Sequence, residues 1–225
     1  MSFWMVLLGW ILFAGTHIGL SAEPFRGKLV SKMGEKGFQG FYSLIALATF
    51  AFLITAFVLT DSGHEVFTVA ASAPWMTHLC NLIMLFAFIL FCCGFANPSP
   101  MGMAPVKTEA VGVIRITRHP MNMSFALFGL AHLLTNRSLE EWIFYSGFLV
   151  YGVLGSMHQD RKKARQGGIN FQSFVESTAI IPFAAIITRK QPLKLREISK
   201  KGLLIAVVVT IVARVLHPSV RGGLF

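Results

Sequence analysis

The chain has 225 residues, of which 54% are hydrophobic and only 13% are charged. This composition excludes an ordinary soluble domain and predicts a single membrane domain over residues 1–225. The net charge of +10 does not indicate nucleic-acid binding, because the basic residues cluster in particular loops, as they do beside membrane spans. We therefore expect the lipid bilayer as a partner and no nucleic acid.

Six apolar runs predict six transmembrane helices. The runs are residues 3–20, 38–60, 76–96, 121–135, 142–157 and 202–216. Most of them approach the roughly 20 residues that a span requires, whereas the fourth and sixth are short and must tilt or thin the bilayer. The first run has no basic segment before it and no cleavage site, so we expect a retained helix and not a signal peptide. The predicted fold is an all-α, polytopic helix bundle.

The basic residues predict the orientation of these helices. They gather in the loops after the first, third and fifth runs, for example at Arg26, Arg115 and Arg161, whereas residues 61–75 contain no Lys or Arg. Cytoplasmic loops are the ones that carry excess Lys and Arg. The pattern therefore predicts an N-terminus outside.

A further apolar stretch, residues 171–188, is flanked by basic residues on both sides. If this stretch crossed the membrane, one basic cluster would lie outside, against the charge rule. Pro182 also interrupts the stretch, because proline cannot continue a helix. We therefore expect a re-entrant or interfacial segment here, which leaves six crossings.

Two histidines, His17 and His132, lie near the ends of the first and fourth apolar runs. An imidazole at membrane depth is costly unless it has a partner, and two neutral imidazoles from separate helices are suitable axial ligands for a haem iron. The alternative is that each ring hydrogen-bonds to a neighbouring helix. The predicted depths of the two residues in the membrane also argue against a shared iron. His17 lies at the cytoplasmic end of its helix, whereas His132 lies about 18 Å beyond Pro120.

The start of the fourth helix has a helix-opening pattern. Pro120 falls at a predicted first helical position, where its missing N–H costs nothing, and His119 falls at the cap. In a straight helix, two side chains thirteen residues apart point about 140° away from each other around the axis. His119 and His132 should therefore not share a face. His119 matches the depth of His17 better, and we keep it as the reserve ligand.

Several long motifs resemble the NnrU family, including its plant members that isomerise cis-zeta-carotene. The motifs are Thr16-His-Ile-Gly-Leu-Ser, Gly34-Glu-Lys-Gly-Phe, Gly112-Val-Ile-Arg-Ile-Thr-Arg-His-Pro, Leu130-Ala-His-Leu, Asp160-Arg-Lys, Ile180-Ile-Pro-Phe-Ala-Ala-Ile and His217-Pro. The resemblance implies haem b on His17 and His132, a redox-dependent change of ligation, and hence an electron donor and an apolar polyene substrate. Where the isomerases have a cysteine one turn before the second ligand, this chain has Gly129, so a thiolate is missing there.

Three arginine side chains are further candidates for cofactor contact. Arg115, Arg118 and Arg161 can bind haem propionates through their guanidinium groups, although anchoring of the cytoplasmic loops explains the first two equally well. Asp160 and Arg161 can instead form a pair on the surface. His217, at the end of the sixth run, is interpreted as structural.

Two other functions compete with a haem-dependent isomerase. Bacterial members of the resembled family are associated with nitrate, nitrite or nitric oxide metabolism, which implies a non-catalytic haem or redox accessory protein, and a start at a membrane helix suits a bacterial inner-membrane protein. Arg118-His119-Pro120 also resembles isoprenylcysteine-type membrane methyltransferases. Two differences argue against methyltransferase activity: Asn122 stands in place of their tyrosine, and Asp160-Arg161 stands in place of their paired glutamates. We therefore expect this chain to share at most the fold of those enzymes.

Overall fold

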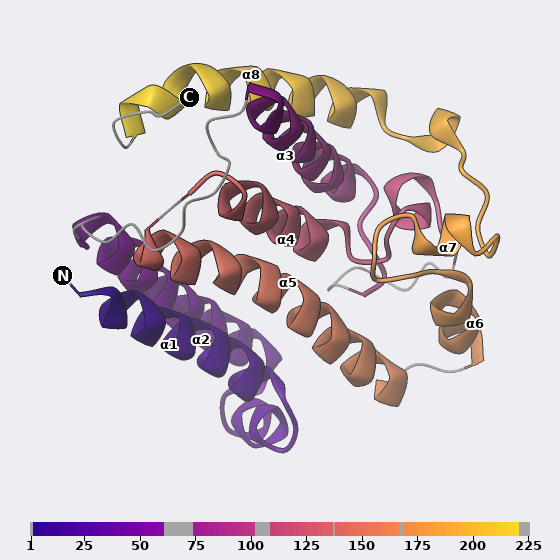
Figure 1. Ribbon diagram of the computed structural model, residues 1–225. Helices are drawn as coiled ribbons and strands as arrows, with labels where there is room; N and C mark the ends of the chain where they lie inside the picture. The colour runs from indigo at the N-terminus through magenta and orange to yellow at the C-terminus, as the bar shows by residue number, and fades with distance from the viewer. Residues whose placement is uncertain (1, 61–73, 102–108, 137, 167–168, 221–225) are drawn as a thin grey trace. The chain divides into compact units, whose positions relative to one another are not determined.

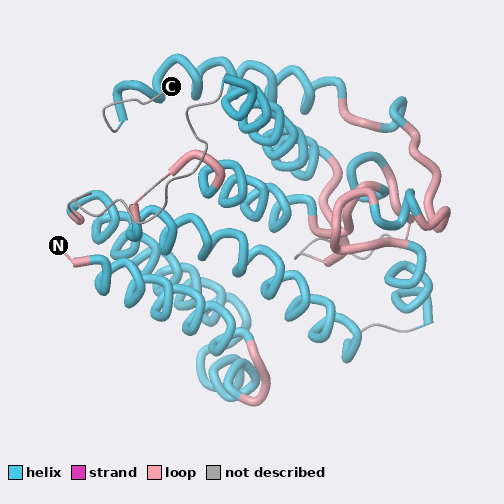
Figure 2. Tube along the Cα trace, in the orientation of Figure 1, coloured by secondary structure: helices cyan, strands magenta, loops and turns pink. Residues whose placement is uncertain are grey.

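The computed structural model describes residues 2–60, 74–101, 109–136, 138–166 and 169–220. Within these ranges the regular structure is helical and no β-strand occurs (Figure 2). The α-helices are α1 (Phe3–Ser21), α2 (Phe25–Leu59), α3 (Pro74–Ala96), α4 (Pro120–Leu133), α5 (Leu139–Gln166), α6 (Ile169–Ser177), α7 (Ala184–Ile187) and α8 (Lys200–Val220), with short 3₁₀ helices η1 (Gly112–Arg115) and η2 (Leu195–Glu197) (Figure 1). The all-α class is thus confirmed.

Each predicted apolar run lies on a helix, but α2 and α5 extend well beyond their runs. Helix α2 begins at Phe25, so the basic segment predicted as a loop before residue 38 is helical. The prediction failed there because hydropathy marks only the apolar part of a helix. The basic and apolar parts meet at a kink at Gly34, whose φ of 75° and ψ of 167° are readily adopted by glycine.

Three of the described helices are long and apolar enough to cross a membrane, namely α1, α2 and α3. Many of their large apolar side chains are exposed, as expected for surfaces that meet lipid and not water; Leu47 on α2, for example, is 67% exposed. By length and composition, these three helices are candidate membrane spans. The count of six crossings stays a prediction, and residues 61–73 of the predicted second loop lie outside the described residues.

The chain divides into two compact units, of which the first comprises residues 1–69 and 136–147. Its core is the close pairing of α1 with α2, where a Cβ on Gly9 would come within 2.9 Å of the Leu53 Cα. The beginning of α5 completes this unit. The Trp10 indole donates a hydrogen bond to the Phe144 carbonyl at 3.0 Å, and the Phe57 and Phe144 rings stack at 3.8 Å.

The second unit comprises residues 70–135 and 148–225. Helix α3 packs against both α4 and α8, and the core contains Leu90, Val113 and Met123. Near the start of α8, a Cβ on Gly202 would lie 2.8 Å from the Cys93 sulfur and 3.0 Å from its Cα. The small residue therefore permits the close approach of α3 and α8.

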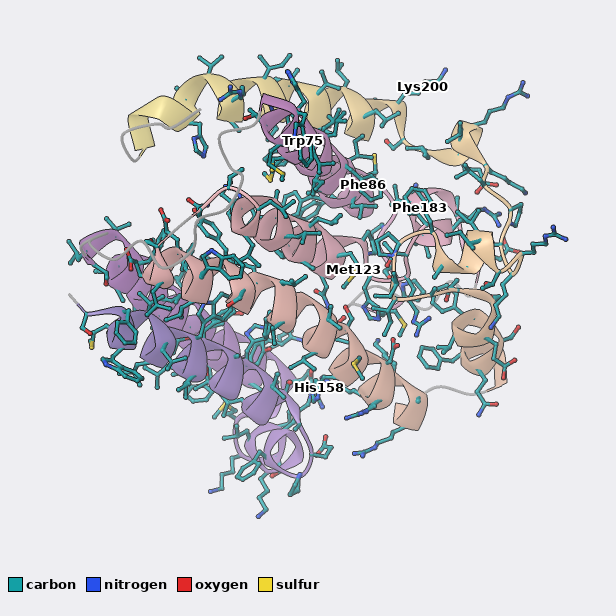
Figure 3. The ribbon with its side chains drawn as sticks, in the orientation of Figure 1. Trp75, Phe86, Met123, His158, Phe183 and Lys200 are labelled. Carbon is teal, nitrogen blue, oxygen red and sulfur yellow. The ribbon has the colours of Figure 1, made fainter. Side chains whose placement is uncertain are left out.

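The stretch 171–188 is broken, as its proline predicts. Helix α6 ends at Ser177 and α7 begins at Ala184, so an irregular segment separates two short helices. This segment is held against residues 116–118: the Thr117 hydroxyl donates to the Ile180 carbonyl at 2.5 Å, and the Phe183 amide donates to the Ile116 carbonyl at 2.9 Å. The Phe183 ring stacks on Phe86 at 5.3 Å (Figure 3). Its re-entrant or interfacial position stays a prediction.

Candidate functional site

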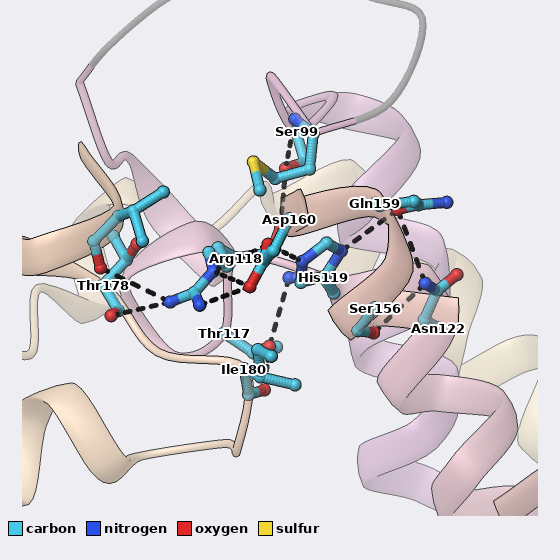
Figure 4. A network of polar contacts seen from close by, with 12 residues as sticks. Ser99, Thr117, Arg118, His119, Asn122, Ser156, Gln159, Asp160, Thr178 and Ile180 are labelled. Carbon is cyan, nitrogen blue, oxygen red and sulfur yellow. Dashed lines mark hydrogen bonds and ion pairs between the residues drawn. The ribbon is translucent and has the colours of Figure 1, made fainter. Parts of the chain in front are cut away.

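A largely buried ion pair joins Arg118 to Asp160 in the second unit (Figure 4). Arg118 precedes α4 and Asp160 lies in the last part of α5. The guanidinium donates to both carboxylate oxygens, from Nε at 3.1 Å and from Nη2 at 2.5 Å. Its third nitrogen donates to the Thr178 carbonyl at 2.8 Å. The side chains are 9% and 15% exposed, so the pair ties three segments together away from water.

His119 belongs to the same network, and both of its ring nitrogens are engaged (Figure 4). Nε2 lies 2.7 Å from Asp160 Oδ1 and donates to it, because an ionised carboxylate can only accept. Nδ1 lies 3.1 Å from Gln159 Oε1. Asn122 extends the network by donating to the Ser156 hydroxyl at 3.1 Å. As a metal ligand, the reserve candidate His119 would have to give up one of these contacts.

The network also controls the charge of Asp160. Burial by itself raises the pKa of this carboxyl, but the hydrogen bonds and positive charges of His119 and Arg118 outweigh burial and leave the pKa below its ordinary value. The carboxylate is therefore ionised at neutral pH. The predicted surface pair with Arg161 is not what forms, since Asp160 contacts Arg118 and Arg161 is exposed.

A second ion pair joins Arg115 to Glu197 in the same unit. Arg115 Nε donates to Glu197 Oε2 at 2.7 Å, and Nη1 donates to the Gln191 side-chain oxygen at 2.6 Å. The Gly112 amide also donates to Glu197 at 3.2 Å. Arg115 above all, then Gly112, lowers the pKa of Glu197 to about 2 in spite of an opposing effect of burial. This pair connects η1 to η2.

His132 lies at the other end of α4 and lines a cavity of about 80 Å³. The cavity is lined by residues of α3, α4 and α8 and by Thr135, among them Cys80, Arg214 and His217. The His132 Nδ1 lies 2.8 Å from the Phe128 carbonyl. A carbonyl only accepts, so Nδ1 carries the ring proton in this arrangement and Nε2 is the acceptor nitrogen. Such a carbonyl partner is typical of histidines that bind metals through the opposite nitrogen.

His17 lies in the first unit, among aromatic side chains. Its ring centre is 4.7 Å from that of Tyr42 and 5.3 Å from that of Phe13. The Tyr42 hydroxyl donates to the His17 carbonyl at 3.1 Å. Because His17 and His132 belong to different units, their convergence on one iron stays a prediction.

The structure thus brings some predicted residues together and separates others. Arg118 and His119 share one network, Arg115 belongs to a second ion pair, and Arg161 is exposed. His132 is at the opposite end of α4 from His119. The sequence interpretation did not identify Gln159 as the partner of His119 or Glu197 as the partner of Arg115. The signal that could have found them is that each is a polar side chain beside basic residues in an otherwise apolar chain.

The described residues form an all-helical fold with three candidate membrane spans, a buried arginine–aspartate–histidine network and a histidine-lined cavity. Comparison with known families gives a match to the family described as NnrU protein over residues 5–222. The chain belongs to the NnrU family. No solved structure matches it.

Two curated relatives match nearly the whole chain. The 15-cis-zeta-carotene isomerase, chloroplastic, of Arabidopsis thaliana is 25% identical over 224 residues, which are 96% of this chain and 60% of the relative. The protein of the same name from Zea mays is 24% identical over 231 residues, covering 97% of this chain and 61% of the relative. The chain therefore spans about three fifths of the length of these relatives.

Proposed function

We propose that this chain is a membrane-bound cis–trans isomerase that acts on zeta-carotene or a related conjugated polyene. The observation that carries the proposal is the match to 15-cis-zeta-carotene isomerases over 96% and 97% of the chain. The chain covers only part of those relatives, so the activity is proposed for the domain that the two share.

The surfaces of the described helices support a lipid-soluble substrate. Leu47 on α2 and Leu82 on α3 are 67% and 64% exposed, so these helices present apolar faces where a polyene dissolved in the bilayer can approach. The His132 cavity also offers a mostly apolar wall. A long hydrocarbon loses no hydrogen bonds on meeting such surfaces, whereas a polar substrate would.

We extend the proposal to haem b, with His132 as one iron ligand and His17 as the second. His132 fits this role because the Phe128 carbonyl at 2.8 Å orients the ring and directs the acceptor nitrogen away from the helix backbone. His17 is held against Tyr42 and Phe13, which supports a fixed ring orientation. When bound, haem would supply a redox-active iron able to act on a conjugated double bond, with an electron donor setting its oxidation state.

The three arginines proposed for the haem propionates are not equivalent. Arg115 and Arg118 already pair with Glu197 and Asp160, so a propionate would compete with a protein carboxylate at either position. Arg161 is exposed, so of the three it is the arginine that a propionate can reach most easily. Its position among the basic residues in the last part of α5 also supports the proposed orientation, with the N-terminus outside. The bacterial inner membrane stays the proposed location.

The proposed activity is tested with the purified full chain in lipid nanodiscs. The chain is incubated in the dark with 15-cis-zeta-carotene, with and without added haem, and under reducing and oxidising conditions. We expect isomer conversion, followed by chromatography and absorption, that exceeds the rate in protein-free nanodiscs. His132→Ala is expected to lose the conversion, while His78→Ala, at an exposed position of α3, retains it.

The same experiment separates the competing functions. Haem binding without conversion in any condition would favour a non-catalytic haem or redox accessory protein and contradict the isomerase. Binding of S-adenosylmethionine without haem would favour the methyltransferase alternative.

A further inference from the structure

We propose that residues 187–201 form a docking surface for anionic phospholipid headgroups. This segment 187–201 connects the end of α7 to the beginning of α8 (Figure 1). The partner is anionic lipid of the surrounding bilayer, with its phosphate on the basic side chains of the segment and its acyl chains along α8. The inference goes beyond the proposed isomerase and does not depend on it.

Segment 187–201 carries a large excess of positive charge. It contains six basic residues and one acidic residue, which give it a net charge of +5. The acidic residue, Glu197, is paired with Arg115 from outside the segment, and Lys194 contacts it at 3.4 Å. The other five basic residues are exposed and form no ion pair with any described residue: Arg189, Lys190, Arg196, Lys200 and Lys201. Their charge is therefore available to phosphate groups.

Large aliphatic side chains lie exposed among these charges. Ile187, Leu193 and Leu195 are 77%, 47% and 66% exposed, whereas the neighbouring Ile186 and Ile198 pack against the core of the unit. The tendency of basic residues to gather on the cytoplasmic side explains the charges but not the exposed aliphatic side chains between them. Basic groups together with exposed aliphatic side chains are typical of surfaces that lie at the boundary between lipid headgroups and acyl chains.

Hydrogen bonds hold the backbone of the segment in place. Arg115 donates from Nη1 to the Gln191 side-chain oxygen at 2.6 Å and from Nε to Glu197 Oε2 at 2.7 Å. The Lys190 amide donates to the Ala185 carbonyl at 2.8 Å. Because a ligand surface that is already ordered loses less conformational entropy on binding, these contacts favour a positioned surface over a flexible basic tail.

Helix α8 offers a surface for the acyl chains of the same lipid. Lys200 is the first residue of α8 (Figure 3), and Leu204 and Ile205 on this helix are exposed. Four residues of helix rise about 6 Å, so an apolar surface begins a short distance beyond the basic residues, as hydrocarbon follows phosphate in a phospholipid. A soluble acidic partner would match the charges but not this apolar continuation.

The predicted orientation also supports an anionic lipid. It places segment 187–201 and the beginning of α8 on the cytoplasmic side, because this segment follows the fifth apolar run and precedes the sixth. Anionic lipids make the cytoplasmic surface of a membrane negative and attract basic segments beside a membrane helix.

The test measures the lipid preference of the full chain purified in detergent. Phosphatidylglycerol and phosphatidylcholine with the same acyl chains are titrated separately, and native mass spectrometry gives a dissociation constant for each. We expect the anionic phosphatidylglycerol to bind more tightly. The triple variant Lys190→Gln/Lys200→Gln/Lys201→Gln should reduce this preference at least about tenfold, because each basic residue near an anionic surface contributes roughly fivefold.

The matched control removes the same charge from another part of the chain. Lys28→Gln/Lys32→Gln/Lys36→Gln alters three exposed lysines of α2, which are predicted on the same side of the membrane. This variant should keep the lipid preference of the unaltered chain. An equal loss of preference in the two triple variants would show that the lipid responds to total charge alone, and would overturn the proposal.

A second pair of substitutions distinguishes a lipid from a soluble acidic partner. Ile187→Ser/Leu195→Ser alters two exposed side chains, so thermal unfolding should be unchanged, while the affinity for phosphatidylglycerol should fall. Binding of polyglutamate, a soluble acidic probe, should not change in this variant. Unchanged affinity for phosphatidylglycerol, together with tight binding of polyglutamate, would indicate a soluble acidic partner and overturn the assignment to lipid.

Glu197→Gln separates the position of the charges from their number. This variant makes the segment one charge more positive but weakens the ion pair with Arg115 that holds it. We expect phosphatidylglycerol to bind less tightly, whereas tighter binding would show that net charge alone attracts the lipid and would overturn the positioned surface. None of these measurements uses zeta-carotene, so failure of the proposed isomerase would leave their outcome unaffected.

Discussion

The two ends of α4 carry histidines in opposite situations. At its beginning, both nitrogens of His119 contact Asp160 and Gln159 in a network that is almost closed to solvent. Near its end, His132 binds its own helix through one nitrogen and faces a cavity that it shares with His217. The first arrangement uses polar groups to hold segments of the chain together. The second places an imidazole beside space that a ligand can fill.

The difference teaches that burial alone does not mark a functional histidine. A buried polar group costs free energy unless its hydrogen bonds are satisfied, and His119 satisfies this requirement within the protein. His132 combines an oriented ring with a neighbouring cavity, which is what a ligand site needs. Substitution of His119 should therefore mainly reduce stability, whereas substitution of His132 should mainly reduce ligand binding.

The largest effect on stability is expected when the carboxylate of Asp160 is removed. Asp160→Ala leaves Arg118 and His119 without their anion in a buried site, and breaking such a pair typically costs about 3–5 kcal/mol of stability. Thermal unfolding of the purified chain and the yield of monodisperse protein measure the effect. Arg161→Ala, the exposed neighbour on α5, is the matched control and should change stability by no more than about 0.5 kcal/mol. Equal stability of the two variants would mean that the network does not hold the fold.

A smaller effect is expected from a methyl group at Gly202. The added Cβ would lie 2.8 Å from the Cys93 sulfur and 3.0 Å from its Cα, so Gly202→Ala should force α3 and α8 apart and cost about 1–3 kcal/mol. The substitution should also weaken ligand binding in the cavity beside His132, because α3 and α8 both line that cavity. Gly15→Ala, where nothing lies within 4 Å, is the control and should be neutral or slightly stabilising. Unchanged stability in both variants would contradict the close packing.

Acid should weaken the link between η1 and η2. The pKa of Glu197 falls from 4.5 to about 2 on folding, and a lowered pKa contributes stability above the unfolded value that is lost as pH falls through the folded value. The melting temperature should therefore decline between about pH 4.5 and pH 2, partly through Asp160, whose pKa is lowered too.

Glu197→Gln isolates the contribution of this link. The variant should show a shallower decline over the same range, because its amide does not titrate, and it should be less stable than the unaltered chain at neutral pH. Melting curves at half-unit pH steps measure both quantities. An identical acid slope in the variant and the unaltered chain would contradict the lowered pKa of Glu197.

The smallest effect on stability is expected at the cavity. His132 is only half-buried and its Nδ1 hydrogen-bonds to its own helix, so His132→Ala should change the free energy of unfolding by less than about 1 kcal/mol. Thermal unfolding without ligand measures this, with Asp160→Ala in parallel. A loss comparable to that of Asp160→Ala would make His132 a structural residue like His119 and would remove the contrast between the two ends of α4.

Several features of the fold follow from the sequence because they depend on neighbouring residues. The apolar runs at 3–20 and 76–96 lie on α1 and α3, Pro120 stands at the first position of α4, and the stretch 171–188 is interrupted. The helical basic segment before residue 38 was missed, because a charged helix leaves no hydropathy signal and the break at Gly34 is a backbone feature.

The sequence by itself determined the helical class of the described residues and where polar residues interrupt the apolar helices, since both follow from local composition and helix-breaking residues. Only the tertiary structure decided which polar groups meet. Arg118 and Asp160 are 42 positions apart, and His132 and His217 come from helices at different places in the chain. No local pattern encodes such a distance in space; it is set by the packing of α3 against α4 and α8, where small residues such as Gly202 allow the helices to approach.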